Sequence, residues 1–143
     1  MMRLAIVASR FNDEIVDGLI DGAKRALVKA GLKWEDVPVF RVPGAFEIPL
    51  VAKKAAQSLK YDAVIAIGCL IKGETPHFEF ISMQASMGLG LAALETGVPI
   101  TFGVITVNTD EQAIARSGDN NENKGYEAAM AAIEMVELLR RMI

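Results

Sequence analysis

Four short runs of apolar residues recur along the chain, and each is closed by polar or turn-forming residues. None of the runs alternates between apolar and polar positions, which is typical of strands buried on both faces of a parallel sheet. Their lengths favour strands over helices. The predicted strands are Leu4–Ala8, Val37–Val42, Ala63–Ile67 and Ile100–Val107.

Helical periodicity fills the segments between these strands. Apolar residues repeat at helical spacing from Ile15 to Ala30, and Gly31 follows where a helix commonly ends. Strands that alternate with helices predict a parallel sheet with right-handed crossovers and helices on both faces. We therefore expect one three-layer αβα domain over residues 1–143, with a flavodoxin-like four-stranded sheet in the order 2-1-3-4. The other predicted helices are Phe46–Leu59, Pro76–Thr96, Asp110–Arg116 and Asn123–Arg141.

The predicted helix Pro76–Thr96 is apolar on nearly every side. Such a helix is normally buried all round, yet a small domain of this class covers only one side of each helix. The uncovered side predicts contact with another subunit, and hence a homo-oligomer. The alternative is a methionine-rich core helix of a monomer.

Composition narrows the classes of function. Hydrophobic residues make up 52% of the chain, charged residues 23%, and the formal net charge is −3. This balance argues against a nucleic-acid partner, since proteins that bind nucleic acids are usually basic. The sequence shows no signal peptide and no apolar run long enough to span a bilayer, so we expect a cytoplasmic protein with no membrane partner. The single cysteine and single histidine are too few for a disulfide or a typical transition-metal site, and no metal is expected.

Candidate chemistry lies after the predicted strands, because open parallel sheets bind ligands beyond the carboxyl ends of their strands. The segment that follows the third strand leads into a helix, with Thr75 as its N-cap and Pro76 at its first position. Free backbone N–H groups at such a point favour a phosphate, although every helix start offers them. The sequence contains no dinucleotide-binding glycine motif, Walker A sequence or hydrolase nucleophile elbow.

Individual residues near these points each allow a functional and a structural interpretation. His77 is placed to transfer protons beside an anion, or it is a structural or solvated histidine. Phe11 and Asn12 would suit a flat heterocycle, or they are a packing ring and an N-cap. Glu47 either accepts hydrogen bonds from sugar-like hydroxyls or only complements the dipole of its helix. Cys69 is expected to be a small buried residue without a basic neighbour.

Taken in order, several segments resemble lumazine synthases, and together they span nearly the whole chain. The segments are Arg10–Asn12, Val42–Pro49, Gly68–Glu79, Phe102–Thr106, Glu111–Arg116, and Asn123–Gly125 followed by Glu127–Ala129. The resemblance implies a transferase of riboflavin biosynthesis that works without a metal or organic cofactor. Its small-molecule substrates would be 5-amino-6-(D-ribitylamino)uracil and 3,4-dihydroxy-2-butanone 4-phosphate. They would condense to 6,7-dimethyl-8-ribityllumazine with release of phosphate and water.

The resemblance also implies roles for individual residues at a pyrimidine site. Phe11 would stack on the pyrimidine, which Asn12 and the backbone at Ala45 and Phe46 would orient. Glu47 would bind the ribityl hydroxyls. The backbone at Leu70 and Ile71 would read the edge of the pyrimidine ring.

Further residues would serve the phosphorylated substrate and the chemistry. The backbone amides of Glu74 and Thr75, with Arg116, would hold the phosphate. His77 would be the catalytic residue that moves protons. Lys124 would contact the ring substituents.

The assembly implied by the resemblance is a homopentamer, in some members packed further into an icosahedral shell. Phe102 begins the fourth predicted strand, whereas the other site residues follow strand ends. At about 3.3 Å per residue it lies roughly 13 Å or more from its own pocket, so a neighbouring subunit would supply it. The polar loop Gly118–Asn123 departs from the usual family pattern, which leaves assembly beyond the ring open.

Two alternatives use the same fold without catalysis. One is a module that binds a flavin or lumazine without turnover, and the other is an engineered cage-forming scaffold with a vestigial site. The presence of the whole set Phe11, Glu47, His77, Arg116 and Lys124 favours the enzyme.

Overall fold

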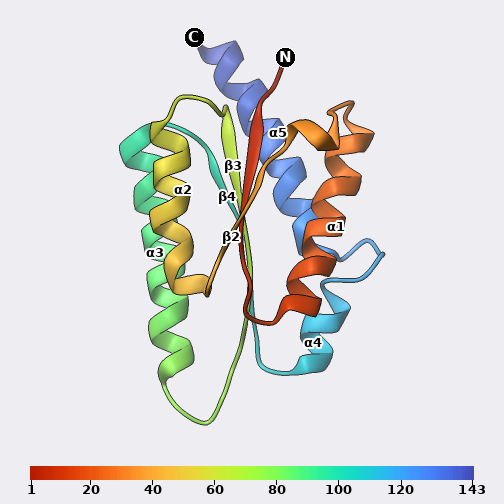
Figure 1. Cartoon of the computed structure of the whole chain (residues 1–143), viewed down its shortest axis with the longest axis vertical. Coiled ribbons are helices and arrows are strands. Elements are labelled where there is room, and N and C mark those ends of the chain that lie inside the picture. Colours follow the sequence, from red (N-terminus) through yellow and green to blue (C-terminus); the bar gives the residue numbers. More distant parts are fainter.

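Four parallel strands form the centre of the molecule, in the order β2-β1-β3-β4 (Figure 1). The computed structural model describes all residues from 1 to 143. This strand order confirms the predicted flavodoxin-like arrangement. The strands are β1 (Leu4–Ser9), β2 (Val39–Val42), β3 (Ala63–Ile71) and β4 (Ile100–Val107).

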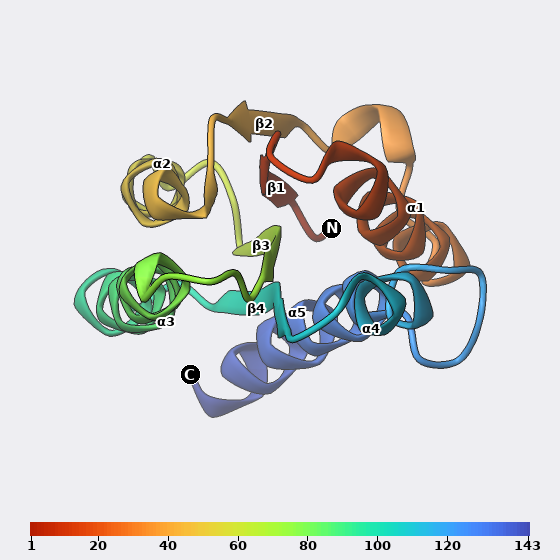
Figure 2. The ribbon, with the colours of Figure 1, turned by 90° about the horizontal axis from the view of Figure 1, so that it is seen from below.

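Helices cover both faces of the sheet, as the alternation of strands and helices predicts (Figure 2). One layer holds α1 (Asp13–Lys29), α4 (Asp110–Ala115) and α5 (Lys124–Met142), and the other holds α2 (Ile48–Gln57) and α3 (His77–Thr96). Two 3₁₀ turns, η1 (Trp34–Asp36) and η2 (Ala45–Glu47), precede β2 and α2. In no helix do length and apolar character together suffice for a membrane crossing.

Strand β3 is longer than the sequence predicts. The prediction ended it at Ile67, whereas the strand continues to Ile71. Residues 68–71 pair in parallel with residues 104–107 of β4, while β1 pairs with β3 only as far as Ala8 opposite Ile67. The last four residues of β3 therefore have a partner strand on one side only.

Two separate cores lie against the two faces of the sheet because successive strand residues point in opposite directions. Ile65 and Ile67 pack in the core beneath α1 and α5, whereas Val64 and Ala66 pack in the core beneath α2 and α3. All four side chains are fully buried. Strands covered on both faces explain the continuous apolar runs in the sequence.

Helix α1 ends where the sequence predicts. Gly31 follows with a φ of +94°, a left-handed conformation that glycine adopts without steric penalty. The turn is closed by the N–H of Leu32, which donates to the carbonyl of Leu27 at 3.0 Å. The chain can thereby reverse toward β2.

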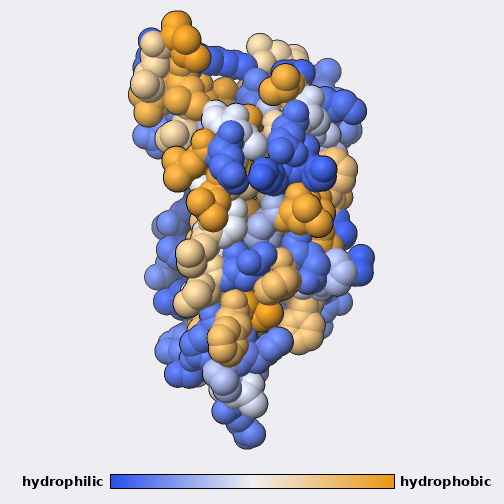
Figure 3. Space-filling model, turned by 90° about the vertical axis from the view of Figure 1, so that its left-hand side faces the viewer, coloured by the Kyte–Doolittle hydropathy of each residue, from blue (hydrophilic) through white to orange (hydrophobic).

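Helix α3 buries only a narrow stripe against its own chain, which consists of Ala85, Leu89 and Ala92. Large apolar side chains cover its outer side, with exposed fractions from 54% to 83%. Figure 3 views this side of the molecule, where apolar and polar side chains are interspersed. The exposed residues are Phe80, Met83, Met87, Leu91 and Leu94. We call this surface the outer face of α3.

Candidate active site

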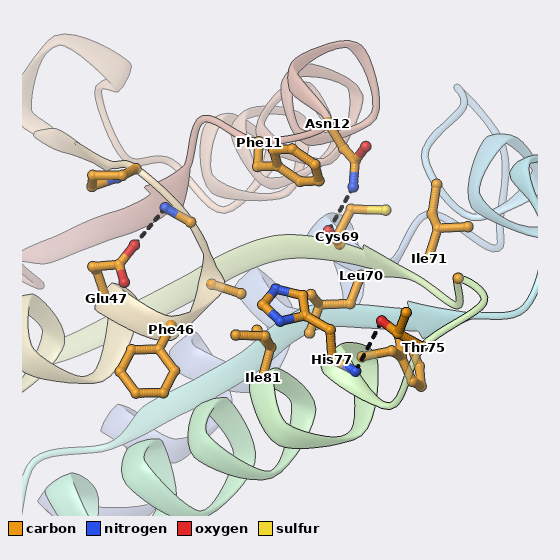
Figure 4. A pocket seen from close by; sticks show the side chains of 15 residues that line it. Phe11, Asn12, Phe46, Glu47, Cys69, Leu70, Ile71, Thr75, His77 and Ile81 are labelled. Carbon is orange, nitrogen blue, oxygen red and sulfur yellow. Dashed lines mark hydrogen bonds between the residues drawn. The ribbon is translucent and has the colours of Figure 1, made fainter.

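A cavity of about 590 Å³ lies at the carboxyl ends of the strands (Figure 4). Its walls come from the β1–α1 turn, the segment between β2 and α2, the end of β3 and the start of α3. Such a volume suits a small-molecule ligand. The lining residues are Phe11, Asn12, Pro43, Gly44, Ala45, Phe46, Glu47, Cys69, Leu70, Ile71, Gly73, Thr75, His77, Phe78 and Ile81.

The β1–α1 turn carries Phe11 and Asn12 into this cavity. The N–H of Phe11 donates to the carbonyl of Pro43 at 3.2 Å, which ties the turn to the segment after β2. The ring of Phe11 is 68% exposed, so one face is available to a ligand. Asn12 has a φ of +61° and makes no side-chain cap for α1. Its Nδ2 instead donates to the carbonyl of Cys69 at 2.9 Å.

The second wall is the 3₁₀ turn η2. Oε1 of Glu47 accepts the N–H of Gly44 at 2.9 Å, which closes the turn and fixes the carboxylate. The carbonyl of Phe46 accepts a hydrogen bond from the side chain of Gln84 on α3 at 3.4 Å, which links α3 to this turn. Ala45, the first residue of this turn, is buried. Oε2 of Glu47 makes no hydrogen bond within the chain and remains available to a ligand.

The floor is formed by the end of β3. Leu70 and Ile71 are partly buried, and their backbone lies beyond the point where β1 stops pairing. Cys69 is 1% exposed, as the sequence predicts. Burial, together with the negative charge of Asp110, raises the pKa of its thiol to about 11. The thiol is therefore neutral and a poor nucleophile at neutral pH.

The start of α3 differs from the prediction by one residue. Pro76 is the N-cap and His77 the first helical residue, so Thr75 is not the N-cap. Thr75 lies outside the helix, where its Oγ1 accepts the N–H of His77 at 3.4 Å. The ring of His77 points into the cavity (Figure 4). The backbone N–H groups of Gly73, Glu74 and Thr75 donate no hydrogen bond within the chain, so they can meet an anion.

Glu74 lies between two lining residues, but its own side chain is exposed and outside the cavity lining. Nine of the predicted site residues line the cavity, and four, including Glu74, do not. The other three are Phe102, Arg116 and Lys124. No cluster of three or more His, Cys, Asp or Glu residues is arranged to hold a metal ion.

Phe102 lies in β4 opposite Ala66, five positions before Val107, which pairs with the last residue of β3. At about 3.3 Å per residue this places it roughly 16 Å along the strand from the cavity end. Its side chain is 49% exposed at the edge strand of the sheet. Phe102 therefore cannot reach the cavity of its own chain.

Arg116 and Lys124 lie together on the α4 and α5 side of the sheet, opposite α3 (Figure 1). The N–H of Lys124 donates to the carbonyl of Arg116 at 2.9 Å. Nη1 of Arg116 donates to the carbonyl of Gln112 at 3.0 Å, and Nζ of Lys124 pairs with Glu127 at 3.0 Å. These two cations form a second group, separate from the cavity residues.

Several cavity residues were not among the predicted site residues: Pro43, Gly44, Cys69, Gly73, Phe78 and Ile81. Phe78 and Ile81 follow His77 by one and four positions, which is the spacing of one helix face. That spacing was readable from the sequence. The helix start had to be known, however, before the face could be assigned.

Comparison with known proteins gives a consistent result. The sequence profile of the 6,7-dimethyl-8-ribityllumazine synthase family matches residues 1–140. A protein of that name from Syntrophus aciditrophicus (strain SB) is 55% identical over 99% of this chain and 92% of its own length. One from Chlorobium chlorochromatii (strain CaD3) is 53% identical over 99% and 91%. A de novo designed Rossmann fold protein covers 78% of this chain with a TM-score of 0.42 and 19% identity, which is too distant to bear on function. The family profile and the full-length relatives agree with the resemblance seen in the sequence, and the chain belongs to the 6,7-dimethyl-8-ribityllumazine synthase family.

Proposed function

We propose that this single-domain protein condenses 5-amino-6-(D-ribitylamino)uracil with 3,4-dihydroxy-2-butanone 4-phosphate. The product is 6,7-dimethyl-8-ribityllumazine, an intermediate of riboflavin biosynthesis. The observation that carries this proposal is the cavity itself. It brings an exposed aromatic ring, a fixed carboxylate, free backbone groups and a histidine to one edge of the sheet in a member of this family.

The pyrimidine is assigned to the side of the cavity lined by β1 and η2. Phe11 offers a ring face for stacking. At the free edge of β3 the backbone groups of Ile71 point away from β4 and offer a donor and an acceptor to a planar heterocycle, with Leu70 beside them. Glu47 has one carboxylate oxygen free for the ribityl hydroxyls, and the other keeps it in place. Ala45 and Phe46 contribute backbone groups from the same turn.

Asn12 supports this subsite in a different way from a simple ligand contact. One of the two amide N–H groups of Asn12 donates to the carbonyl of Cys69, and the second N–H and Oδ1 remain available to the substrate. The bond holds the Phe11 turn against the end of β3. We assign Asn12 a substrate-orienting role that it exerts chiefly through this link.

The phosphorylated substrate is assigned to the start of α3. The free N–H groups of Glu74 and Thr75 and the positive end of the helix dipole favour a phosphate there. Arg116 would complete the site with a guanidinium that matches phosphate geometry. His77 lies between this point and the pyrimidine side.

The chemistry requires proton transfers at each step. The amine of the uracil attacks the ketone and forms an imine with loss of water. Elimination of phosphate then gives an enol, which tautomerises to a new ketone, and the second amine closes the ring at this ketone with loss of a second water. His77 would take the proton from the attacking amine and return it to the departing oxygen. Holding two substrates in one cavity supplies much of the remaining rate gain.

We propose that the active unit is a ring of five identical subunits with cavities shared between neighbours. Two observations support it. The outer face of α3 exposes large apolar side chains, and Phe102, Arg116 and Lys124 do not line the cavity of their own chain. A neighbour would supply these three residues, with Lys124 contacting the ring substituents. Native mass spectrometry separates a ring from a larger icosahedral assembly of rings.

We place the enzyme in the cytoplasm. Its only cysteine is a free thiol, which suits a reducing compartment. Fractionation of the source cells checks this location.

The deciding experiment is turnover. The purified protein is mixed with both substrates, and the characteristic fluorescence of the lumazine product is followed with time. Product formation that needs both substrates supports the proposed enzyme. Binding of the pyrimidine without product would instead favour a non-catalytic binding module or scaffold.

A further inference from the structure

Asn123 is one of only two buried polar residues of the chain, and its side chain is 1% exposed. Its Nδ2 donates to the carbonyl of Gly118 at 2.9 Å and to the carbonyl of Gly18 on α1 at 3.1 Å. Its Oδ1 accepts the N–H of Tyr126 at 3.0 Å and so caps α5. One side chain thus joins α1, the loop before α5 and the start of α5.

Glycines make room for this junction. A Cβ at Gly22 would collide with the side chain of Asn123, and one at Gly18 would collide with the carbonyl of Ser117. A Cβ at Gly125 would collide with the carbonyl of Leu19 on α1. The loop and the first turn of α5 therefore lie directly on the backbone of α1. This close approach is needed for the amide of Asn123 to reach the α1 carbonyl.

The loop fixed in this way is residues 117–122, and Arg116 and Lys124 flank it. The loop is polar, and its remaining tie to α1 is Arg25, whose Nη2 lies 3.5 Å from the carbonyl of Gly118 and whose Nε pairs with Asp119. The side chain of Asp119 is 89% exposed, and pairs so exposed contribute little. The N–H of Lys124 donates to the carbonyl of Arg116 at 2.9 Å and closes the loop at its base. The buried amide of Asn123 is therefore the main constraint that ties the closed loop to α1.

We infer that Asn123 is a positioning residue for the phosphorylated substrate. By tying the loop to α1, it sets where the two cations, already joined through the backbone bond from Lys124 to Arg116, lie relative to the rest of the subunit. The inference rests on the proposed function, in which these cations serve the substrate. Positive side chains bind a phosphorylated ligand better when their position on the subunit is set before binding.

The test uses Asn123→Ser. Serine keeps an oxygen that can cap α5 but removes the two donors that hold the loop. We expect the KM for the phosphorylated substrate to rise by about tenfold, since small misplacements of binding groups are costly. The KM for the pyrimidine stays within about twofold because most of its proposed contacts come from Phe11 and Glu47, and of the two cations only Lys124 touches its ring substituents. If Asn123→Ser does not fold, Asn123→Asp keeps both the cap oxygen and the side-chain volume and takes its place.

A matched control separates positioning from stability. Val136→Ala removes buried volume from α5 at a residue that is 3% exposed and distant in sequence from the loop. It is expected to lower the melting temperature without changing either KM. If Asn123→Ser raised both KM values together, or if Val136→Ala produced the same selective rise, Asn123 would be only structural and the inference would be wrong.

A double-mutant cycle identifies the group through which Asn123 acts. In an Arg116→Ala background, Asn123→Ser is expected to add less than about twofold to the KM, because the positioned group is gone. Full additivity would overturn the inference.

Calorimetric titration with inorganic phosphate gives a readout independent of turnover. Weaker phosphate binding in Asn123→Ser supports the inference even if no lumazine forms, whereas unchanged phosphate binding contradicts it.

Discussion

The side-chain amide of Asn12 donates to the carbonyl of Cys69 at 2.9 Å and joins the β1–α1 turn to the end of β3. The bond lies just beyond the last backbone pairing of β1 with β3, which is that of Ala8 with Ile67. A side chain thus continues the connection that the sheet no longer provides. The left-handed backbone of Asn12 turns the chain into α1 at the same point.

Replacement of Asn12 tests both parts of this arrangement. Asn12→Ala loses the hydrogen bond and places alanine in a left-handed conformation, so we expect it to lower the free energy of unfolding by about 2 kcal/mol. Asn12→Gly loses the bond without the backbone strain and costs about 1 kcal/mol. Urea denaturation measures both. Equal losses would show that the conformation carries no strain.

We expect the same two variants to change the kinetics as well. Loosening the Phe11 turn raises the KM for the pyrimidine in both, with the phosphorylated substrate unaffected. An unchanged pyrimidine KM would remove Asn12 from the subsite.

His77→Ala is expected to slow turnover by about 10²-fold without abolishing it, because general acid–base catalysis contributes on that scale and binding survives. Thr75→Ala, which removes the hydroxyl that accepts the N–H of His77, serves as a neighbouring control with a small effect. A His77→Ala rate equal to that of the unmodified enzyme would contradict the assignment.

Arg116→Ala is expected to raise the KM for the phosphorylated substrate by about tenfold or more, as loss of a charged hydrogen-bonding partner costs about 1.5–3 kcal/mol in typical cases. Binding of the pyrimidine, measured by calorimetry, should stay within about twofold. Arg140→Ala provides a matched loss of charge at the far end of the sheet, where it contacts Asp62 and the carbonyl of Met1. If the pyrimidine were the ligand lost, the two subsites would have been assigned the wrong way round.

Mixing two impaired chains tests whether neighbours share a cavity, with activity measured at a concentration of the phosphorylated substrate that is low enough for both variants to be slow. His77→Ala and Arg116→Ala chains are combined in equal amounts under conditions that let subunits exchange. Random rings would then place an intact His77 beside an intact Arg116 in about a quarter of the sites. Recovery of activity near that fraction supports shared cavities. No recovery in rings verified as mixed by mass spectrometry would mean that each cavity is complete within one chain.

The thiol of Cys69 predicts a loss of stability at high pH. Its pKa is raised from 9.0 to about 11 in the folded protein. The unfolded chain therefore loses the thiol proton first, and stability falls as the pH rises from about 9 to 11. The loss from this group amounts to about 2 to 3 kcal/mol at most. Denaturation at several pH values in this range measures the loss. In Cys69→Ala the free energy of unfolding should fall less steeply with pH, and an identical pH slope in both proteins would mean that another group causes the loss.

The sheet could be predicted because its central strands β1 and β3 are buried on both faces, which leaves a continuous apolar run in the sequence. The end of β3 could not, because residues 68–71 extend the strand only by pairing with β4. The predicted start of α3 was also wrong, by one residue. Pro76 has a ψ of 5° outside the helix, and no local sequence rule distinguishes that conformation from a first helical position.

The cavity followed in part from one rule, that ligands bind beyond the carboxyl ends of parallel strands. Phe11, Glu47 and His77 follow three different strands and meet in space. Phe102 breaks the rule because it lies near the amino end of its strand. Its proposed role came from the family resemblance, and contact with a cavity from that position would require a second chain.

The end of β3, residues 68–71, has a partner strand on one side only, and this affects how the site tolerates sequence change. Beyond Ile67 the strand presents peptide groups, which every residue except proline carries alike. If the heterocycle binds main-chain groups here as proposed, its recognition by these groups does not depend on the identity of Leu70 or Ile71. Homologous chains can therefore vary these two side chains while they keep the same ligand, provided that neither becomes proline. Specificity that comes from main-chain groups is kept wherever the fold is kept.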